Sequence, residues 1–154
     1  MAHIPLSLLP WPALDVLDKQ TMPGNCEAIA PVMAWLEDMG EKQQWHAKSL
    51  FALTLCADEA LTNIATHAQA PAGEVLHIEL VLGRLEDGFA LCIADNGAAF
   101  DPTSRDSAQL AESLDEADIG GHGLRLMRHY LQHFEYQRVE GWNWLLLGVA
   151  NPAV

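Results

Sequence analysis

Three polar segments of the chain carry residue types and spacings that could take part in binding or catalysis. In the first, Glu59, Asn63 and His67 recur at four-residue spacing, which places them on one face of a predicted helix. A carboxylate there could orient or deprotonate a nucleophile, and the Asn63 amide oxygen suits a hard cation such as Mg²⁺. A solvated polar helix face is the alternative interpretation of the same three residues.

The second segment, Asp95-Asn-Gly97, follows the apolar run 89–94, which predicts a buried strand. An acid at the end of such a strand could accept a hydrogen bond from an exocyclic amine, and Gly97 would admit a flat ring beside it. Asp-Asn-Gly is also a strong turn signal in its own right. A simple turn is therefore the alternative interpretation.

The third segment is Gly120-Gly-His-Gly123, and a predicted helix starts directly after it at Leu124. Glycines before a helix leave consecutive N–H groups exposed at the positive end of the helix dipole, an arrangement that suits phosphate. No Gly-Lys-Ser/Thr follows and no strand directly precedes, so the segment is neither a P-loop nor a dinucleotide fingerprint. A plain glycine-rich turn is the alternative.

Apolar periodicity predicts the elements that must position these segments. The expected helices are 26–40 with Asn25 as its N-cap, about 44–68, and 124–131, and the expected strands are 75–82, 89–94, 135–139 and 142–149. This order predicts an α+β fold: a two-layer sandwich with three main helices on one face of a mixed, mostly antiparallel sheet.

Two stretches have weaker patterns. Residues 1–23 are punctuated by prolines and match no assignable unit beyond a short edge strand within 13–17. Residues 101–119 form a long polar connection with a short helix expected at 107–114, and connections of this length are commonly lids or binding loops. With 154 residues and no internal repeat or linker, the chain is expected to form a single domain.

Composition narrows the function classes. The 21 acidic residues against 8 basic ones give a net charge of −13. This balance argues against nucleic-acid and anionic-membrane surfaces, which need clustered Lys and Arg. No signal peptide or membrane span is visible, and Cys26, Cys56 and Cys92 are expected to be small buried hydrophobes rather than disulfides or zinc ligands. These features favour a reducing cytoplasm.

Three motifs in order resemble the N box and the two glycine boxes of the Bergerat-fold ATPases, the group of gyrase, Hsp90, histidine kinases and MutL: Glu59-x-x-x-Asn63, Asp95-x-Gly97 and Gly121-x-Gly123. Longer segments narrow the resemblance to the anti-sigma-factor serine/threonine kinases of bacterial partner-switching systems: residues 58–67, 95–102, 120–128 and 136–145. The resemblance covers about residues 26–147 and implies a sandwich of the Bergerat ATP-binding type.

By that resemblance, Asn63 would hold Mg²⁺, Glu59 would act as base or orienting residue, and Asp95 would bind the adenine amino group of ATP. The connection 101–119 would be the ATP lid, and Mg²⁺ would reconcile an acidic chain with a tetra-anionic ligand. The lid contains one basic residue, so γ-phosphate stabilisation would fall to Arg105, His122, Arg125 or a partner. The nucleotide-binding positions implied besides Asn63 and Asp95 are Gly97, Arg105, Gly121, His122, Gly123 and Leu124.

The activity implied is phosphorylation of a STAS-domain anti-anti-sigma protein, alternating with sequestration of a sigma factor or another regulatory protein. A non-catalytic ATP-binding interaction switch is the alternative, because the lid is poor in basic residues. A metal-dependent hydrolase built on the seven histidines is a third interpretation, although only His129 and His133 have i, i+4 spacing. The client protein and the oligomeric state, a homodimer included, stay open.

Overall fold

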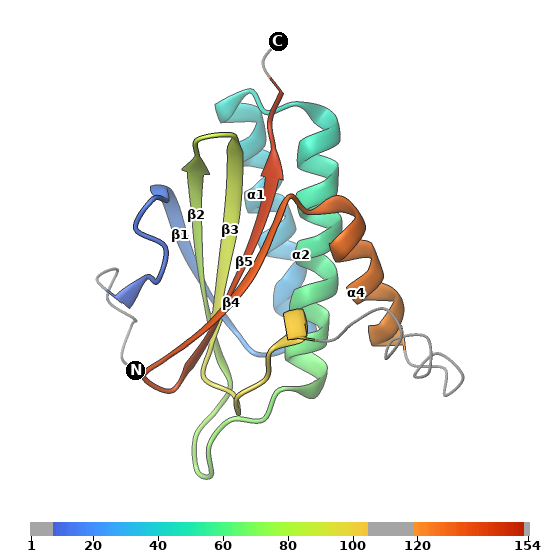
Figure 1. The fold of residues 1–154 in the computed structure, drawn as a ribbon. Helices are drawn as coiled ribbons and strands as arrows, with labels where there is room; N and C mark the ends of the chain where they lie inside the picture. Colours follow the sequence, from blue (N-terminus) through green and yellow to red (C-terminus); the bar gives the residue numbers. More distant parts are fainter. Residues whose placement is uncertain (1–7, 105–118, 153–154) are drawn as a thin grey trace.

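The chain forms a five-stranded sheet with helices on one face (Figure 1). The computed structural model describes residues 8–104 and 119–152, so Arg105 and the helix predicted at 107–114 lie outside the described residues. The elements are β1 (Asp15–Pro23), α1 (Ile29–Gln43), α2 (Ala47–His67), β2 (His77–Leu85), β3 (Gly88–Asp95), α4 (Ile119–Tyr130), β4 (His133–Val139) and β5 (Trp142–Ala150), with short 3₁₀ turns at Cys26–Ala28 and Pro102–Ser104.

The strand order β1-β2-β3-β5-β4 confirms the predicted α+β sandwich, and all four described strand pairings are antiparallel. Both predicted hairpins, β2–β3 and β4–β5, are present. The pairing of β3 with β5 is the long-range feature that matters for function, because it places Asp95 directly opposite Asn143 at the end of the sheet. Directly paired residues point to the same face of a sheet.

Alternation along the central strands decides which face Asp95 occupies. Phe89, Leu91 and Ile93 of β3 point into the core beneath the helices, and the intervening small residues point to the outer face. Asp95 is the next position in the helix-facing series, since side chains of a strand repeat every second residue. A strand that is apolar throughout therefore ends by presenting a carboxylate to the helical layer.

Helix α2 is fixed along the sheet by contacts at its N-terminal end. Ser49 Oγ donates a hydrogen bond to the Ala150 carbonyl at 2.6 Å, and the Trp45 ring, just before the helix, stacks on Phe89 with centroids 3.6 Å apart. Asn25 caps the 3₁₀ turn that leads into the first helix, since its Oδ1 accepts a hydrogen bond from the Ala28 N–H at 3.1 Å; α1 itself runs from Ile29 to Gln43 rather than over the expected 26–40. These contacts set the position of the polar residues farther along α2.

The N-terminal residues have two roles that their sequence pattern does not reveal. The edge strand expected within 13–17 is longer and begins later, as β1, which pairs along β2. The segment before it covers the outer face of the sheet, where Leu9, Trp11 and Leu14 pack in one cluster with Val81 and Trp144. The outer face is therefore closed by the chain's own N-terminal segment.

The cysteines are free thiols, as expected, but one of them is not buried. Cys56 and Cys92 lie in the interior, whereas Cys26 is exposed because the 3₁₀ turn that carries it buries none of its residues. Burial, with a smaller contribution from nearby Glu59, raises the pKa of the Cys56 thiol to about 12. That thiol is therefore protonated and unreactive at neutral pH. In the described part of the chain, no helix is long and apolar enough to cross a membrane.

Candidate active site

A cavity of about 500 Å³ lies between the C-terminal half of α2 and the sheet end where β3 stops. Asn63 and His67 line it from α2, and Asp95 lines it from β3. The loop 98–102 and residues of α4, β4 and β5 complete the wall. A cavity of this size suits a small-molecule or cofactor ligand. The structure thus brings two of the three predicted motifs to one cavity.

Asp95 is a buried carboxylate with one oxygen engaged and the other open. Its Oδ1 accepts hydrogen bonds from the Gly97 N–H at 2.9 Å and from Asn143 Nδ2 at 3.1 Å, while Oδ2 has no hydrogen-bond partner among the described residues. Burial raises the pKa of Asp95, and these two hydrogen bonds and Arg138 offset part of that rise. An oriented acceptor that faces a cavity is suited to a ligand N–H donor.

Gly97 lets the loop after β3 approach the end of α2. A Cβ added at this position would lie 2.9 Å from Asp95 Oδ1 and 3.1 Å from the Ala68 Cβ, which is too close for an ordinary side chain. The next residue ties the loop down, since the Ala98 N–H donates to the Gln69 carbonyl at 2.9 Å. Gly97 therefore shapes the cavity wall.

Glu59 lies one turn from Asn63, but it does not line the cavity. Its carboxylate rests against α4 at Gly123, where an added Cβ would overlap Glu59 Oε2 and lie 3.0 Å from Cδ. The predicted shared face of α2 is therefore divided: Asn63 and His67 border the cavity, and Glu59 borders the helix beside it. Gly123 is thus the point at which the third motif, in α4, contacts the acid of the first motif, in α2.

The glycine segment is part of a helix rather than a loop before one. The helix expected to start at Leu124 starts at Ile119, so Gly120 to Gly123 occupy its first turns. Glycine costs about 1 kcal/mol per residue in a helix relative to alanine, and here α4 gains packing against α2. The free N–H groups of the first turn then belong to residues 119–122. The side chains of His122 and Leu124 lie outside what the structure describes.

The basic residues near the cavity are held by backbone carbonyls. Arg138 donates to the Gly97 carbonyl at 2.9 Å, at the Asp95 end. Arg128 of α4 donates to the Thr103 carbonyl at 3.0 Å, which anchors the beginning of the 101–119 connection to α4. Arg125 is exposed on α4.

The i, i+4 histidine pair is not a metal pair. His129 lies in α4, but His133 begins β4 and contacts Asp87 instead, with Nε2 3.0 Å from Oδ2. Within residues 8–104 and 119–152, no group of three or more His, Cys, Asp or Glu side chains could hold a metal ion. The i, i+4 spacing of His129 and His133 therefore does not support the interpretation as a metal-dependent hydrolase.

Sequence reasoning missed three polar residues at the cavity, two of which, Tyr136 and Asn143, line it. Asn143 of β5, together with Tyr136 and Arg138 of β4, forms a hydrogen-bonded group around Asp95. The available signal was a lone amide in the otherwise apolar strand 142–149. The partner of this amide could not be identified from the sequence. β5 pairs with its sequence neighbour β4 and also with β3, which is distant in the sequence.

Comparison with known proteins shows the family to which this fold and cavity belong. The family model for the histidine kinase-like ATPase domain matches residues 22–148, so the chain belongs to this family. Over 113 residues it is 53% identical to the serine/threonine-protein kinase BtrW of Bordetella bronchiseptica, an alignment covering 73% of this chain and 79% of BtrW. Two serine-protein kinases RsbW, from Bacillus cereus strains Q1 and AH187, are each 23% identical over 124 residues, with 78% of this chain and 76% of each relative covered.

Proposed function

We propose that this protein is a Mg²⁺·ATP-dependent serine/threonine protein kinase of a partner-switching system, folded as a single ATP-binding domain. The observation that carries the proposal is the Asp95 carboxylate, which lines the cavity at 5% exposure, with Oδ1 engaged by the protein and Oδ2 without a hydrogen-bond partner among the described residues. The exocyclic amino group of adenine is the donor that such an oxygen would accept. The relatives named protein kinases support the activity.

The residues present fit a magnesium ion carried by the nucleotide. Mg²⁺ is usually held by one or two side-chain oxygens, several waters and substrate phosphates. Asn63 borders the same cavity as Asp95, and the described residues offer no ready-made cage of acids and histidines. Asn63 would therefore hold the ion, which would neutralise part of the phosphate charge in a chain of net charge −13.

Glu59 is the residue that would act on the protein substrate. As the serine Oγ bonds to the γ-phosphorus, the bond from that phosphorus to the β–γ bridging oxygen breaks and ADP leaves. Glu59 would accept the hydroxyl proton and pass it to solvent. Its place against Gly123, one helical turn from Asn63, supports this role. The first turn of α4 would face the phosphates with its free N–H groups, and the 101–119 connection would act as the lid.

The substrate we propose is a STAS-domain anti-anti-sigma protein, and the alternating target is a sigma factor or another regulatory protein. The motif order and the kinases BtrW and RsbW support a regulatory kinase. The free cysteines suit action in the cytoplasm.

Phosphotransfer can be tested with γ-labelled ATP and a STAS-domain protein encoded beside this one. We expect label on a serine or threonine of the STAS protein, in a reaction that requires Mg²⁺. Binding of ATP without any transfer would contradict the kinase and favour the rival function, an ATP-binding interaction switch. The observation that favours this rival function is that the 101–119 connection contains a single basic residue.

Replacing Gly123 with alanine should reduce phosphotransfer without harming the fold. The added Cβ would overlap the Glu59 carboxylate, a flexible group that can move away. Alanine also favours the helix by about 1 kcal/mol over glycine. We expect a melting temperature at or above that of the wild type, and kcat lower by roughly tenfold or more, as for a displaced general base. If this variant is stable and its kcat is unchanged, the contact between Gly123 and Glu59 would no longer support a catalytic role for Glu59.

A further inference from the structure

Asn143 is a buried side-chain amide with both ends engaged. Its Nδ2 donates to Asp95 Oδ1 at 3.1 Å, to the Ala98 carbonyl at 2.9 Å and, more weakly, to the Gly97 carbonyl at 3.3 Å. Asn143 is 6% exposed and lines the cavity. Three acceptors therefore converge on one nitrogen.

The other end of the amide meets three donors. Asn143 Oδ1 accepts from Arg138 Nη1 at 3.0 Å, from the Phe100 N–H at 3.3 Å and from the Tyr136 hydroxyl. Reversing the amide would place its nitrogen against donors and its oxygen against acceptors. The network thus determines the amide orientation, which diffraction alone often leaves ambiguous.

This network decides which Asp95 oxygen remains for a ligand. Asn143 and the Gly97 N–H both donate to Oδ1, so Oδ2 is the oxygen that remains for a ligand in the cavity that Asp95 lines. The same amide holds the loop 97–100 through two carbonyls and one N–H. One side chain from β5 therefore orients the acid and fixes the loop beside it.

We infer that Asn143 is a positioning residue for recognition of the nucleotide base: it acts through Asp95 and the 97–100 loop rather than on the phosphates. This inference rests on the proposed ATP-binding function and goes beyond it by assigning base recognition to a strand residue outside the three motifs. A positioning role at the base end should alter nucleotide affinity and leave the chemical step unchanged.

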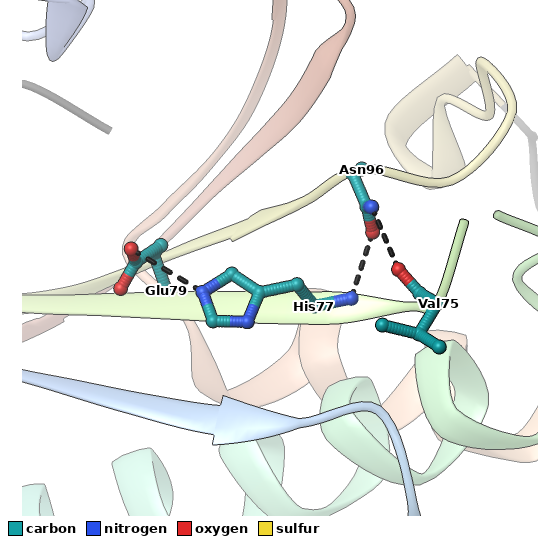
Figure 2. A network of polar contacts seen from close by, with 4 residues as sticks. All are labelled: Val75, His77, Glu79 and Asn96. Carbon is teal, nitrogen blue, oxygen red and sulfur yellow. Dashed lines mark hydrogen bonds and ion pairs between the residues drawn. The ribbon is translucent and has the colours of Figure 1, made fainter. Parts of the chain in front are cut away.

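Asn96 provides a matched control. It is also an amide that ties the loop after β3 to the sheet, but it does so on the side away from the cavity: Oδ1 accepts from the His77 N–H at 2.7 Å, and Nδ2 donates to the Val75 carbonyl at 2.9 Å (Figure 2). Asn96 does not line the cavity. Loss of either amide loosens the loop, but only loss of Asn143 frees the Asp95 carboxylate.

The test compares Asn143→Leu, Asn143→Ser and Asn96→Leu by titration with Mg²⁺·ADP and with adenosine. We expect Asn143→Leu to weaken both ligands at least tenfold and by similar factors, because the base contact is common to both. Asn143→Ser should lie between it and the wild type, since the shorter hydroxyl side chain keeps a polar group beside Asp95 but not the direct bond at 3.1 Å. Asn96→Leu should stay within threefold of the wild type. In phosphotransfer, Asn143→Ser should raise KM for ATP and change kcat less than twofold.

Equal losses in Asn143→Leu and Asn96→Leu would overturn the inference, because general loosening of the loop would then explain them. So would wild-type affinity in both Asn143 variants, or a loss confined to ADP. If circular dichroism shows that the leucine variant is unfolded, the serine variant decides by the same comparison. Failure of the wild-type protein itself to bind ADP would instead contradict the proposed function.

Discussion

Replacing Asp95 with asparagine should weaken binding of Mg²⁺·ATP by roughly 100-fold or more, since a hydrogen bond to a charged group is worth about 1.5–3 kcal/mol and a mismatched donor adds to the loss. The variant keeps an oxygen for the Gly97 N–H and Asn143 Nδ2, which hold one side of the group. Its new NH₂ would then face the cavity, where it meets the adenine amino group donor to donor. Calorimetric titration with a non-hydrolysable ATP analogue measures the loss.

Asp87→Asn is the matched control for this variant. Asp87 is an exposed carboxylate in the turn between β2 and β3, at the other end of the strand that carries Asp95. Both substitutions remove one negative charge, so a long-range charge effect would appear equally in both. Near-equal affinity of the Asp95 and Asp87 variants would contradict the adenine-binding role.

The Asp95→Asn substitution should stabilise the ligand-free protein at neutral pH. Burial raises the pKa of Asp95 above its ordinary value of 3.8, so the folded state binds this proton more tightly than the unfolded chain. The contribution of Asp95 to stability therefore falls as pH rises from the ordinary pKa through the folded-state pKa. Urea unfolding should show Asp95→Asn more stable than the wild type at pH 7 and a smaller difference near pH 4. If Asp95→Asn were less stable than the wild type at pH 7, burial of the ionised Asp95 carboxylate would not destabilise the folded state.

Replacing Glu59 with glutamine should reduce phosphotransfer by a factor of roughly 10²–10⁴, the usual contribution of a general base, while ATP affinity changes little. The amide has nearly the same shape as the carboxylate, so it can keep the place against Gly123 but cannot accept the hydroxyl proton. Single-turnover transfer to the STAS substrate measures the chemical step, and titration measures binding separately.

Asp58→Asn is a matched control because Asp58 is the neighbouring acid on a different face of α2. It is exposed and lines a groove between α1 and α2, away from the cavity. We expect this variant to retain transfer within about twofold of the wild type, as surface substitutions away from the site usually have small effects. If Glu59→Gln transferred phosphate at the wild-type rate, a group other than Glu59 would accept the hydroxyl proton.

The fold was largely predictable from sequence, because the helices and hairpins depend on local patterns. The apolar runs 89–94 and 142–149 gave the correct strands, and the spacing of Asn63 and His67 gave a correct helix face. The N-terminal segment was not predictable, since its residues pack on the outer face through long-range contacts that leave no periodicity.

The site was predictable where it consists of motifs and unpredictable where it depends on register. Asp95 and Asn63 could be assigned to one site by the order of the motifs. The role of Asn143 required knowing that β5 lies beside β3, a pairing between segments 48 positions apart. The start of α4 was misjudged because glycines normally end helices, and here tertiary packing against α2 overrides their low propensity.

The most direct test of the central claim, that the motifs form one Mg²⁺·ATP site, is a crystal structure with a non-hydrolysable ATP analogue and Mg²⁺. We predict the adenine amino group about 3 Å from Asp95 Oδ2, a normal hydrogen-bond distance. We also predict the ion on the Asn63 oxygen and the phosphates at the first turn of α4. A nucleotide bound elsewhere, or a base that makes no contact with Asp95, would contradict the account.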